Sequence, residues 1–325
     1  MRTKRPRIPC GAFPFVPRHF PRDLGLHAGY QHHSGNFGGM MIYSSGQDYL
    51  SAPQKRVLLF GMSGLGKTHL SNMLRDQAAY FHYSVDYRIG TRYMGEFISD
   101  NFKREAMKVP LLRELMMTDS VYIASNITFD NLAPLSTYLG KPGNPAQGGV
   151  DFAQYQHRQA QHAQAEIAAM LDVPRFIARA QDIYGYQNFV CDTSGSICEV
   201  VNADDAKDPV MTALSENLLL VWIKGSEAHK AELIRRFDRA PKPIYYNPGF
   251  LQTVWADYLA HNNKPAQQVD PDEFLRFGYA RLLNHRQPRY AAMARWGVTL
   301  TADDVAAVRT PADFDALIGA AIDRA

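Results

Sequence analysis

Eight consecutive residues constrain the fold of this chain more than any other feature: Gly61-Met62-Ser63-Gly64-Leu65-Gly66-Lys67-Thr68. They match the pattern G-x-x-x-x-G-K-[ST], in which glycines permit backbone conformations that other residues resist. Successive N–H groups can then point into one concave loop and bind an anion. A short apolar run, Val57-Leu58-Leu59-Phe60, precedes the loop, and apolar residues at helical spacing follow it. The pattern therefore predicts a buried strand, a phosphate-binding loop and a helix in succession.

The loop and its context predict that the chain binds a nucleoside triphosphate, and we expect ATP with Mg²⁺. Lys67 would reach the β and γ phosphates, and Thr68 would offer its hydroxyl to the metal ion. The helix that begins at the loop adds the positive end of its dipole. We expect contacts with the nucleotide from every residue of the loop and from the one that follows: Gly61, Met62, Ser63, Gly64, Leu65, Gly66, Lys67, Thr68 and His69.

Short apolar segments alternate with segments of helical periodicity along the rest of the chain. Such alternation predicts an α/β fold, a parallel sheet flanked by helices. We expect strands at residues 55–60, 80–85, 188–191, 218–223 and 298–300. We expect helices at residues 67–77, 152–171, 174–184, 226–237, 248–261, 271–284 and 288–295, with a last pair after Thr301. Residues 87–187 show little strand character, so we expect a helical insertion there that forms a substrate lid or subdomain.

The N-terminal residues differ from the rest in composition. Residues 1–40 contain five prolines, six glycines and six Lys or Arg against one acid, and they lack periodicity. We therefore divide the chain into a disordered or loosely attached basic segment, 1–50, and a P-loop domain, 51–325. Three interpretations of the segment stay open: a solvated tail, a start codon assigned too early, and an arm that contacts an anionic partner.

Composition argues against several classes of function. The net charge is +3, and because residues 1–40 carry the excess, the body of the protein lacks the basic track of a nucleic-acid-binding protein. No apolar run is long enough to cross a membrane. The cysteines, Cys10, Cys191 and Cys198, are too few for a disulfide framework, which favours the cytoplasm. His157 and His162 lie on a polar helix, and we expect both to be solvated.

Two aspartates follow predicted strands and could serve the phosphate site. Asp86 ends the second strand, and Asp192 ends the third, before Thr193-Ser194-Gly195-Ser196. Ligands of open α/β sheets bind at the carboxyl ends of the strands, so both acids are expected at the nucleotide edge. Each could hold Mg²⁺ beside Thr68, and Asp86 could instead take a proton from an acceptor hydroxyl. Which of the two holds the metal stays open, as does the alternative that each caps the next helix.

Four arginines could bind an anionic acceptor or offset charge in the transition state. Arg88 and Arg92 lie just beyond Asp86, where bidentate contacts to an anion are expected. Arg286 ends a predicted helix and could face the same site. Arg239 ends the helix after the fourth strand, and a mobile lid there would bring it over the transferring phosphate. Each of these arginines could instead be a surface or helix-capping cation.

With these pieces in order, the chain over about residues 55–310 resembles the P-loop kinases of small molecules, of the shikimate and gluconate kinase kind. The resemblance lies in the glycine loop, the second strand ending in Asp86, the small-residue turn after Asp192, and a strand, helix and basic lid ending at Arg239. It implies that the loop lysine and Arg239 stabilise charge and that Asp86 is a base or metal ligand. Two departures make shikimate itself unexpected: Arg88 stands where the family usually has a second acid, and about 100 residues separate the second and third strands.

The chain is also similar to bacterial proteins described only as ATPases, which implies nucleotide binding and little more. The sequence therefore favours an ATP-dependent phosphotransferase with Lys67 as a catalytic residue, acting on a small, anionic acceptor. The first alternative is an ATP-hydrolysing switch that works with a protein partner and needs a polar residue to position water. A second alternative is a module that binds ATP with little turnover. We expect no nucleic-acid or membrane partner.

Overall fold

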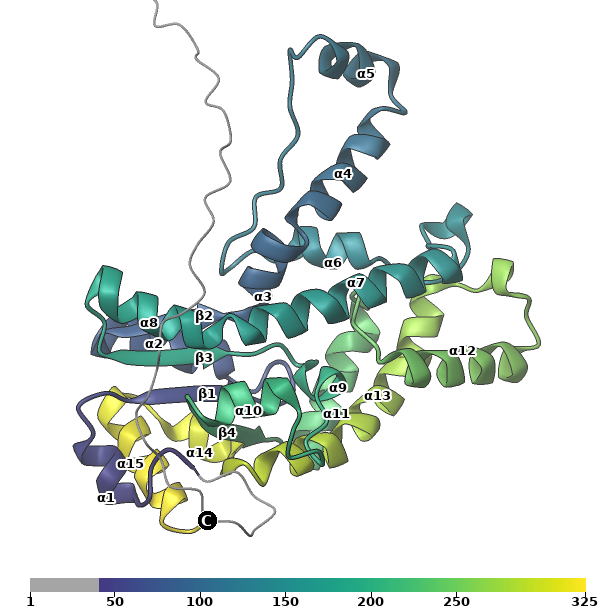
Figure 1. Ribbon diagram of the computed structural model, residues 1–325. Helices are drawn as coiled ribbons and strands as arrows, with labels where there is room; N and C mark the ends of the chain where they lie inside the picture. The colour runs from purple at the N-terminus through teal and green to yellow at the C-terminus, as the bar shows by residue number, and fades with distance from the viewer. Residues whose placement is uncertain (1–40) are drawn as a thin grey trace, which may run out of the picture. The chain divides into compact units, whose positions relative to one another are not determined.

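Residues 41–325 are described by a computed structural model, and they are built around one parallel sheet of five strands (Figure 1). The strands are β1 (Arg56–Phe60), β2 (Tyr80–Ser84), β3 (Asn188–Asp192), β4 (Leu219–Lys224) and β5 (Gly297–Thr301), in the spatial order β2-β3-β1-β4-β5. Strands covered on both faces need side chains that are apolar throughout. β1 shows this pattern, since its residues 57–60 are fully buried. The five predicted strands are confirmed, with ends that differ by one residue at most.

The order of the strands decides which helices cover which face of the sheet. Crossovers between parallel strands are right-handed, so connections that run in opposite directions along the sheet lie on opposite faces. α2 (Lys67–Ala78) links β1 to β2 and packs with the C-terminal helix α15 (Pro311–Ile322). α8 (Val173–Tyr184), α10 (Pro209–Ser215) and α13 (Pro271–Ala294) belong to connections in the other direction and form the second layer.

A short helix that the sequence analysis missed, α1 (Gly46–Ser51), joins the layer of α2 and α15. Tyr49 is fully buried, and its hydroxyl donates to Asp315 Oδ1 of α15 at 2.8 Å. The Gly46 amide donates to Asp323 Oδ1 at 2.6 Å. Residues 46–50 therefore pack as part of the P-loop domain and not as part of a loosely attached segment. The rest of that prediction concerns residues 1–40 and lies outside the described residues.

The connection from β2 to β3 is helical and adds no strand to the sheet. α7 packs against α6 and against the first turns after β2, whereas α4 and α5 extend away from the sheet (Figure 1). α5 has no buried residue, and Leu111 and Met117 on it are exposed. The elements before α8 are α3 (Val85–Arg88), the π-helical turn η1 (Ile89–Tyr93), α4 (Gly95–Ala106), α5 (Pro110–Met117), α6 (Ala133–Leu139), the 3₁₀ turn η2 (Pro145–Gln147) and α7 (Phe152–Leu171).

The chain after β4 is mostly helical and builds a second apolar cluster. Ser226 and Thr301 cap the first turns of their helices in reciprocal capping boxes. The second cluster is rich in aromatic rings and includes Tyr155, Trp255 and Phe274. None of the described helices is long and apolar enough to cross a membrane. The elements are α11 (Glu227–Arg239), α12 (Pro248–Asn262), η3 (Ala266–Gln268), α13, β5 and α14 (Ala302–Ala307).

α13 runs unbroken through Pro288, which corrects one prediction. Proline lacks an N–H and clashes with the preceding turn, so the sequence predicts two helices, 271–284 and 288–295. The structure has a single helix with Pro288 inside it. Leu283, Arg286 and Tyr290, on either side of the proline, are all buried. Tertiary packing of these side chains therefore outweighs a local cost of about 3 kcal/mol.

Candidate functional site

The phosphate loop lies between β1 and α2, at the carboxyl edge of the sheet. Gly61 has a φ of 133°, and a Cβ atom there would lie 2.5 Å from the carbonyl oxygen of Ile223 on β4. Only glycine fits at this position, because the loop passes directly against the neighbouring strand. Gly66 is the N-cap of α2 and contributes no side-chain cap. The first N–H groups of α2 are therefore available to an anion.

Lys67 is held inside the phosphate loop by backbone carbonyls. Its side chain is buried, and the ammonium donates to the carbonyl oxygens of Gly61 at 3.0 Å and Met62 at 3.1 Å. Burial lowers the pKa of Lys67, and the carboxylates of Asp192 and Asp86 oppose this shift. The loop thus contains one cation in a defined position, with two acids near it.

Thr68 joins the phosphate loop to the end of β3. Its hydroxyl donates to Asp192 Oδ2 at 2.7 Å. The two groups meet because β3 is next to β1 in the sheet, with Leu59 opposite Asp192. Hydroxyl and carboxylate oxygens suit Mg²⁺, which takes few protein ligands and completes its shell with phosphate oxygens and water. Residues 41–325 contain no group of three or more His, Cys, Asp or Glu side chains that could hold a metal ion.

Asp86 lies one strand further from the loop, in the first turn of α3. It is half-buried, and its carboxylate has no hydrogen-bond partner among the described residues. Burial raises the pKa of Asp86 to about 6, and the charge of Asp192 adds to the shift while Lys67 opposes it. A carboxyl group with a raised pKa is a stronger base, which suits it to proton abstraction. The geometry therefore separates the two acids, with Asp192 beside Thr68 and Asp86 at the cavity described next.

A cavity of about 200 Å³ adjoins the phosphate loop, and Ser63 of the loop and Asp86 both line it. The turn after β3 packs closely here, since a Cβ atom at Gly195 would lie 2.6 Å from the Ser63 hydroxyl oxygen. A molecule in this cavity therefore lies beside the phosphate loop. The other lining residues come from five parts of the chain: Leu132, Leu135, Ser136 and Leu139 at α6, His162 on α7, Ser194, Gly195 and Ser196 after β3, Pro243, Ile244 and Tyr245 after α11, and Arg286 on α13.

Glu166 on α7 positions the turn after β3, which lines the cavity together with Ser63 of the loop. The hydroxyls of Ser194 and Ser196 both donate to its carboxyl group, Ser196 at 2.8 Å to Oε2. Glu166 is fully buried, and burial raises its pKa to about 7 although the two serine bonds oppose the shift. Because Glu166 does not line the cavity, it acts on the site through the two serines.

Arg286 lines the cavity and is also bound by groups of the protein. Its Nε donates to Glu199 Oε1 at 2.9 Å, and its Nη2 donates to the carbonyl oxygen of Tyr245 at 2.9 Å. Glu199 belongs to the short helix α9 (Ile197–Val200), and its side chain has no exposed surface. The guanidinium is therefore compensated by a buried carboxylate and held in one orientation.

His162 is buried at the cavity, which corrects the expectation that it is solvated. It is 4% exposed, and its ring stacks on Tyr245 with 5.1 Å between centroids. Burial lowers the pKa of His162 to about 4, and the positive charge of Arg286 adds to the shift. The imidazole is therefore uncharged at neutral pH. Its Nδ1 lies 3.7 Å from Glu166 Oε2 and has no hydrogen-bond partner in the described part of the chain.

Of the three arginines expected at the acceptor, only Arg286 lines the cavity. Arg88 is bound by Asp172 instead, with 2.6 Å between Nη2 and Oδ2. Arg92 is exposed and does not line the cavity. The expectation of an anionic acceptor rested on Arg88 and Arg92 together, so these contacts remove most of its support.

The helix α11 lies close to the outer rim of the phosphate loop. The Cδ2 atom of Leu233 is 3.1 Å from the position that a Cβ atom at Gly64 would take. Arg239 stands at the end of α11, where it is exposed and donates to the carbonyl oxygen of Arg235 at 3.3 Å. Arg239 does not line the cavity in this conformation.

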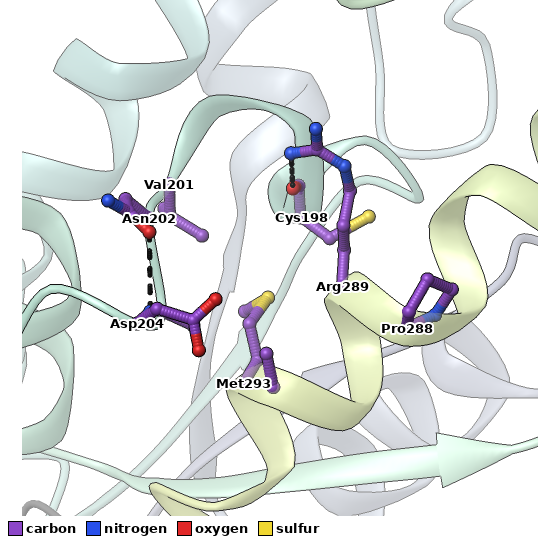
Figure 2. A pocket seen from close by; sticks show the side chains of 9 residues that line it. Cys198, Val201, Asn202, Asp204, Pro288, Arg289 and Met293 are labelled. Carbon is purple, nitrogen blue, oxygen red and sulfur yellow. Dashed lines mark hydrogen bonds between the residues drawn. The ribbon is translucent and has the colours of Figure 1, made fainter. Parts of the chain in front are cut away.

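A larger cavity, of about 320 Å³, lies between α13 and the segment that follows α9 (Figure 2). Figure 2 shows Arg289 pointing toward Cys198, to whose carbonyl oxygen its Nη1 donates at 3.4 Å. Asn202 and Asp204 lie on the opposite side of this cavity (Figure 2). Neither the phosphate loop nor the strand-end aspartates line it. Proximity to these groups, and not volume, identifies the smaller cavity as the candidate site.

The sequence analysis missed Glu166 and the burial of His162, although a signal was present. The buried positions of α7 include Tyr155, His162, Ala165, Glu166 and Ala169, which recur at the spacing of one helix face. The apolar members of this set are small or widely spaced, and the helix is rich in Ala and Gln. The spacing of Tyr155, Ala165 and Ala169 is that signal, and it is weak because Ala153 and Ala160 on the same helix are exposed.

No family model matches the chain, and no curated protein sequence matches it. Among solved structures, a shikimate kinase from Bacteroides thetaiotaomicron is similar at 15% sequence identity and a TM-score of 0.35, over 83% of this chain and 96% of that chain. A similarity at this TM-score carries no argument about fold or function. The phosphate loop between β1 and α2 and the parallel sheet instead define the class: an α/β protein with a P-loop.

Proposed function

We propose that this protein transfers the γ-phosphoryl group of ATP to a hydroxyl group of a small molecule. One observation carries the proposal: Asp86 and Ser63 of the phosphate loop line the same cavity. A carboxylate with no hydrogen-bond partner among residues 41–325 thus stands beside the place where a γ-phosphate would end. A plain ATPase needs room for a water molecule, whereas a cavity of about 200 Å³ has room for a small organic acceptor.

In this mechanism the loop amides and Lys67 bind the phosphates, while Thr68 and Asp192 hold Mg²⁺. The metal ion, when bound, neutralises charge on the β and γ phosphate oxygens. Asp86 accepts the proton of the acceptor hydroxyl as that oxygen bonds to the γ-phosphorus. The bond between the γ-phosphorus and the bridging oxygen breaks in the same step, and ADP leaves. The pKa of about 6 suits Asp86 to the role of base.

Arg239 is proposed to offset charge on the transferring phosphoryl group. For that contact α11 has to move, because the Arg239 guanidinium is exposed and bonded to the carbonyl of Arg235. Closure of a helix over the phosphate loop would also exclude water from the reaction. Arg236, which is bound to Glu232 on the same helix, is the matched position for comparison with Arg239.

The test is ATP turnover with and without a panel of small hydroxylated compounds. We compare the wild type with Lys67→Ala and Asp86→Asn, and with Asp100→Asn, an exposed aspartate of α4 that does not line the cavity. We expect slow turnover that one compound raises at least tenfold, an effect that both active-site variants abolish and Asp100→Asn keeps. Turnover that no compound changes, or a stimulation that survives Asp86→Asn, refutes the proposal.

A second candidate function is an ATP-hydrolysing switch that works with a protein partner. The observation that favours it is the apolar surface of α5, where Leu111 and Met117 are 64% and 72% exposed. Exposed apolar side chains that gather on one element mark sites of protein contact. Turnover that is indifferent to every small compound and unaffected by Asp86→Asn would favour this candidate over the phosphotransferase.

A further inference from the structure

The cavity beside the phosphate loop presents five polar side chains that make no side-chain hydrogen bond in the described part of the chain: Asp86, Ser63, Ser136, His162 and Tyr245. His162 is the clearest of them, because it is 4% exposed and stacking on Tyr245 fixes the plane of its ring. An unpaired polar group in a buried place costs free energy. The buried, unpaired Nδ1 of His162 is therefore the observation that indicates a ligand, whereas Ser63 is exposed and Asp86 and Ser136 are partly buried, and these three offer further hydrogen-bonding groups to that ligand.

The remaining polar lining of the cavity is already bonded within the protein. The hydroxyls of Ser194 and Ser196 donate to Glu166. Arg286 donates through Nε to Glu199 and through Nη2 to a backbone carbonyl, so only part of its guanidinium is open to a ligand. These groups shape the cavity and leave the recognition of a ligand mainly to the unpaired ones.

The charges around the cavity do not favour an anion. Arg286 is the one permanent cation among its lining residues, and Glu199 compensates it at 2.9 Å in a buried pair. His162 is uncharged at neutral pH, since its pKa is about 4. Asp86 contributes an acid on one side, and Glu166 lies behind the serine turn. A carboxylate or phosphate on the acceptor would meet a compensated cation and a repelling acid.

The rest of the wall is apolar. It consists of three leucines at α6, Leu132, Leu135 and Leu139, together with Pro243 and the side chain of Ile244. Scattered hydrogen-bonding groups on an apolar wall suit a molecule that carries both O–H groups and a C–H surface. The hydroxyls pair with the polar side chains while the C–H surface packs on the leucines.

We propose that the phosphoryl acceptor is an uncharged polyhydroxylated compound, a polyol or sugar, bound through Asp86, His162 and Ser136 beside the compensated Arg286–Glu199 pair. This inference rests on the proposed function for the chemistry that follows binding. It replaces the anionic acceptor expected from the sequence. The Arg286–Glu199 pair determines specificity in this scheme, because a compensated guanidinium still donates hydrogen bonds but no longer attracts an anion.

The test measures binding to the full chain by calorimetry, with Mg²⁺ and a non-hydrolysable ATP analogue present. The probes are matched pairs that differ in one terminal group: sorbitol and gluconate, ribitol and ribonate, glucose and glucuronate. We expect that in at least one pair the uncharged member binds at least tenfold more tightly. Binding of the carboxylate members alone, or of no probe at millimolar concentration, overturns the proposal.

Two variants test whether Glu199 and His162 determine the preference for the uncharged probe. Glu199→Gln keeps a hydrogen-bond acceptor for Arg286 and removes the compensating charge, so the preference should shift toward the carboxylate member at least tenfold. His162→Phe keeps the stacking on Tyr245 but loses the nitrogens, so the uncharged probe should bind at least tenfold more weakly. His157→Phe, at an exposed position of α7, is the control and should change nothing. Unaltered preference in Glu199→Gln with a wild-type Tm, or unaltered binding in His162→Phe, overturns the assignment.

The binding readout separates this inference from the proposed function. Tight binding of an uncharged probe without phosphoryl transfer to any bound probe supports the inference and refutes the phosphotransferase. Transfer of phosphate to a carboxylate probe alone supports the phosphotransferase and overturns the inference. If Glu199→Gln fails to fold, binding of the matched probe pairs to the wild type and to His162→Phe still tests whether the acceptor is an uncharged polyhydroxylated compound.

Discussion

Replacing Glu166 by glutamine tests whether the buried carboxyl group behind the serine turn resists ionisation near neutral pH. The side chain is fully buried on α7 and receives hydrogen bonds from Ser194 and Ser196. Burial raises the pKa of Glu166 from an ordinary value of 4.5 to about 7. Glutamine has nearly the same shape, its single Oε1 can accept from both Ser194 and Ser196, and its amide N–H takes the place of the O–H of the protonated acid, but it cannot ionise. The substitution therefore isolates the cost of the negative charge.

The magnitude follows from linkage between proton binding and folding. The difference between 4.5 and about 7 corresponds to about 3.4 kcal/mol that disfavours the ionised form in the folded state. Because the folded pKa lies above the unfolded value, this stability is fully present below pH 4.5 and is lost as the pH rises through about 7. Between pH 5 and pH 8 the wild type should lose about 2.5 kcal/mol that Glu166→Gln does not lose.

The assay is urea unfolding followed by tryptophan fluorescence at several pH values between 5 and 8. Taking the difference between Glu166→Gln and wild type cancels the titration of other groups, and the difference should grow by about 2.5 kcal/mol toward pH 8. Glu114→Gln, at an exposed glutamate of α5, should give a difference that does not vary with pH. The same difference at pH 5 and pH 8 for Glu166→Gln would mean that burial does not raise this pKa, and the reasoning would be refuted.

Three further predictions concern other parts of the molecule. Tyr49→Phe removes the hydroxyl that donates to Asp315 and should lower the free energy of unfolding by about 1–2 kcal/mol in urea titrations. Tyr184→Phe, at a side chain that is 60% exposed, should leave it unchanged, and equal effects of the two would contradict the argument. Pro288→Ala should raise the Tm, because alanine restores an N–H donor inside α13 and removes a ring that costs up to about 3 kcal/mol. A lower Tm would show that α13 depends on the proline. With saturating substrates, kcat should rise with pH through about 6 and then become constant, because Asp86 must lose its proton to act as the base. A kcat that falls over this pH range would exclude Asp86 as the base.

Much of the fold could be predicted because local signals and tertiary packing agree. The inner strands β1, β3 and β4 are short, mostly apolar runs that are almost entirely buried, whereas the edge strand β5 alternates buried and exposed residues. The reciprocal capping box at Thr301 is a local device, so it can be recognised from a few neighbouring residues. The phosphate loop is equally local, since its function depends on the backbone of consecutive residues.

The features that could not be predicted depend on contacts between distant residues. The sequence predicts that Arg88 binds the substrate, but in the structure Asp172, 84 residues further along, binds Arg88. The sequence predicts a helix break at Pro288, but in the structure buried side chains on both sides of the proline hold α13 together. The two strand-end aspartates could be placed at one edge of the sheet, but only the strand order shows that Asp192 is the one next to β1. Sequence spacing carries no information about any of these partners.

The contact between α1 and α15 has a consequence for how the protein is made. Tyr49 and Asp315 are separated by 266 positions, and Gly46 and Asp323 by 277. During synthesis on the ribosome, α1 and β1 emerge well before the helix that covers Tyr49. Contacts with such large sequence separation form late. A nascent chain that already contains the phosphate loop therefore still exposes Tyr49 and one side of its helix layer until α15 has emerged, and it is prone to aggregate in that interval.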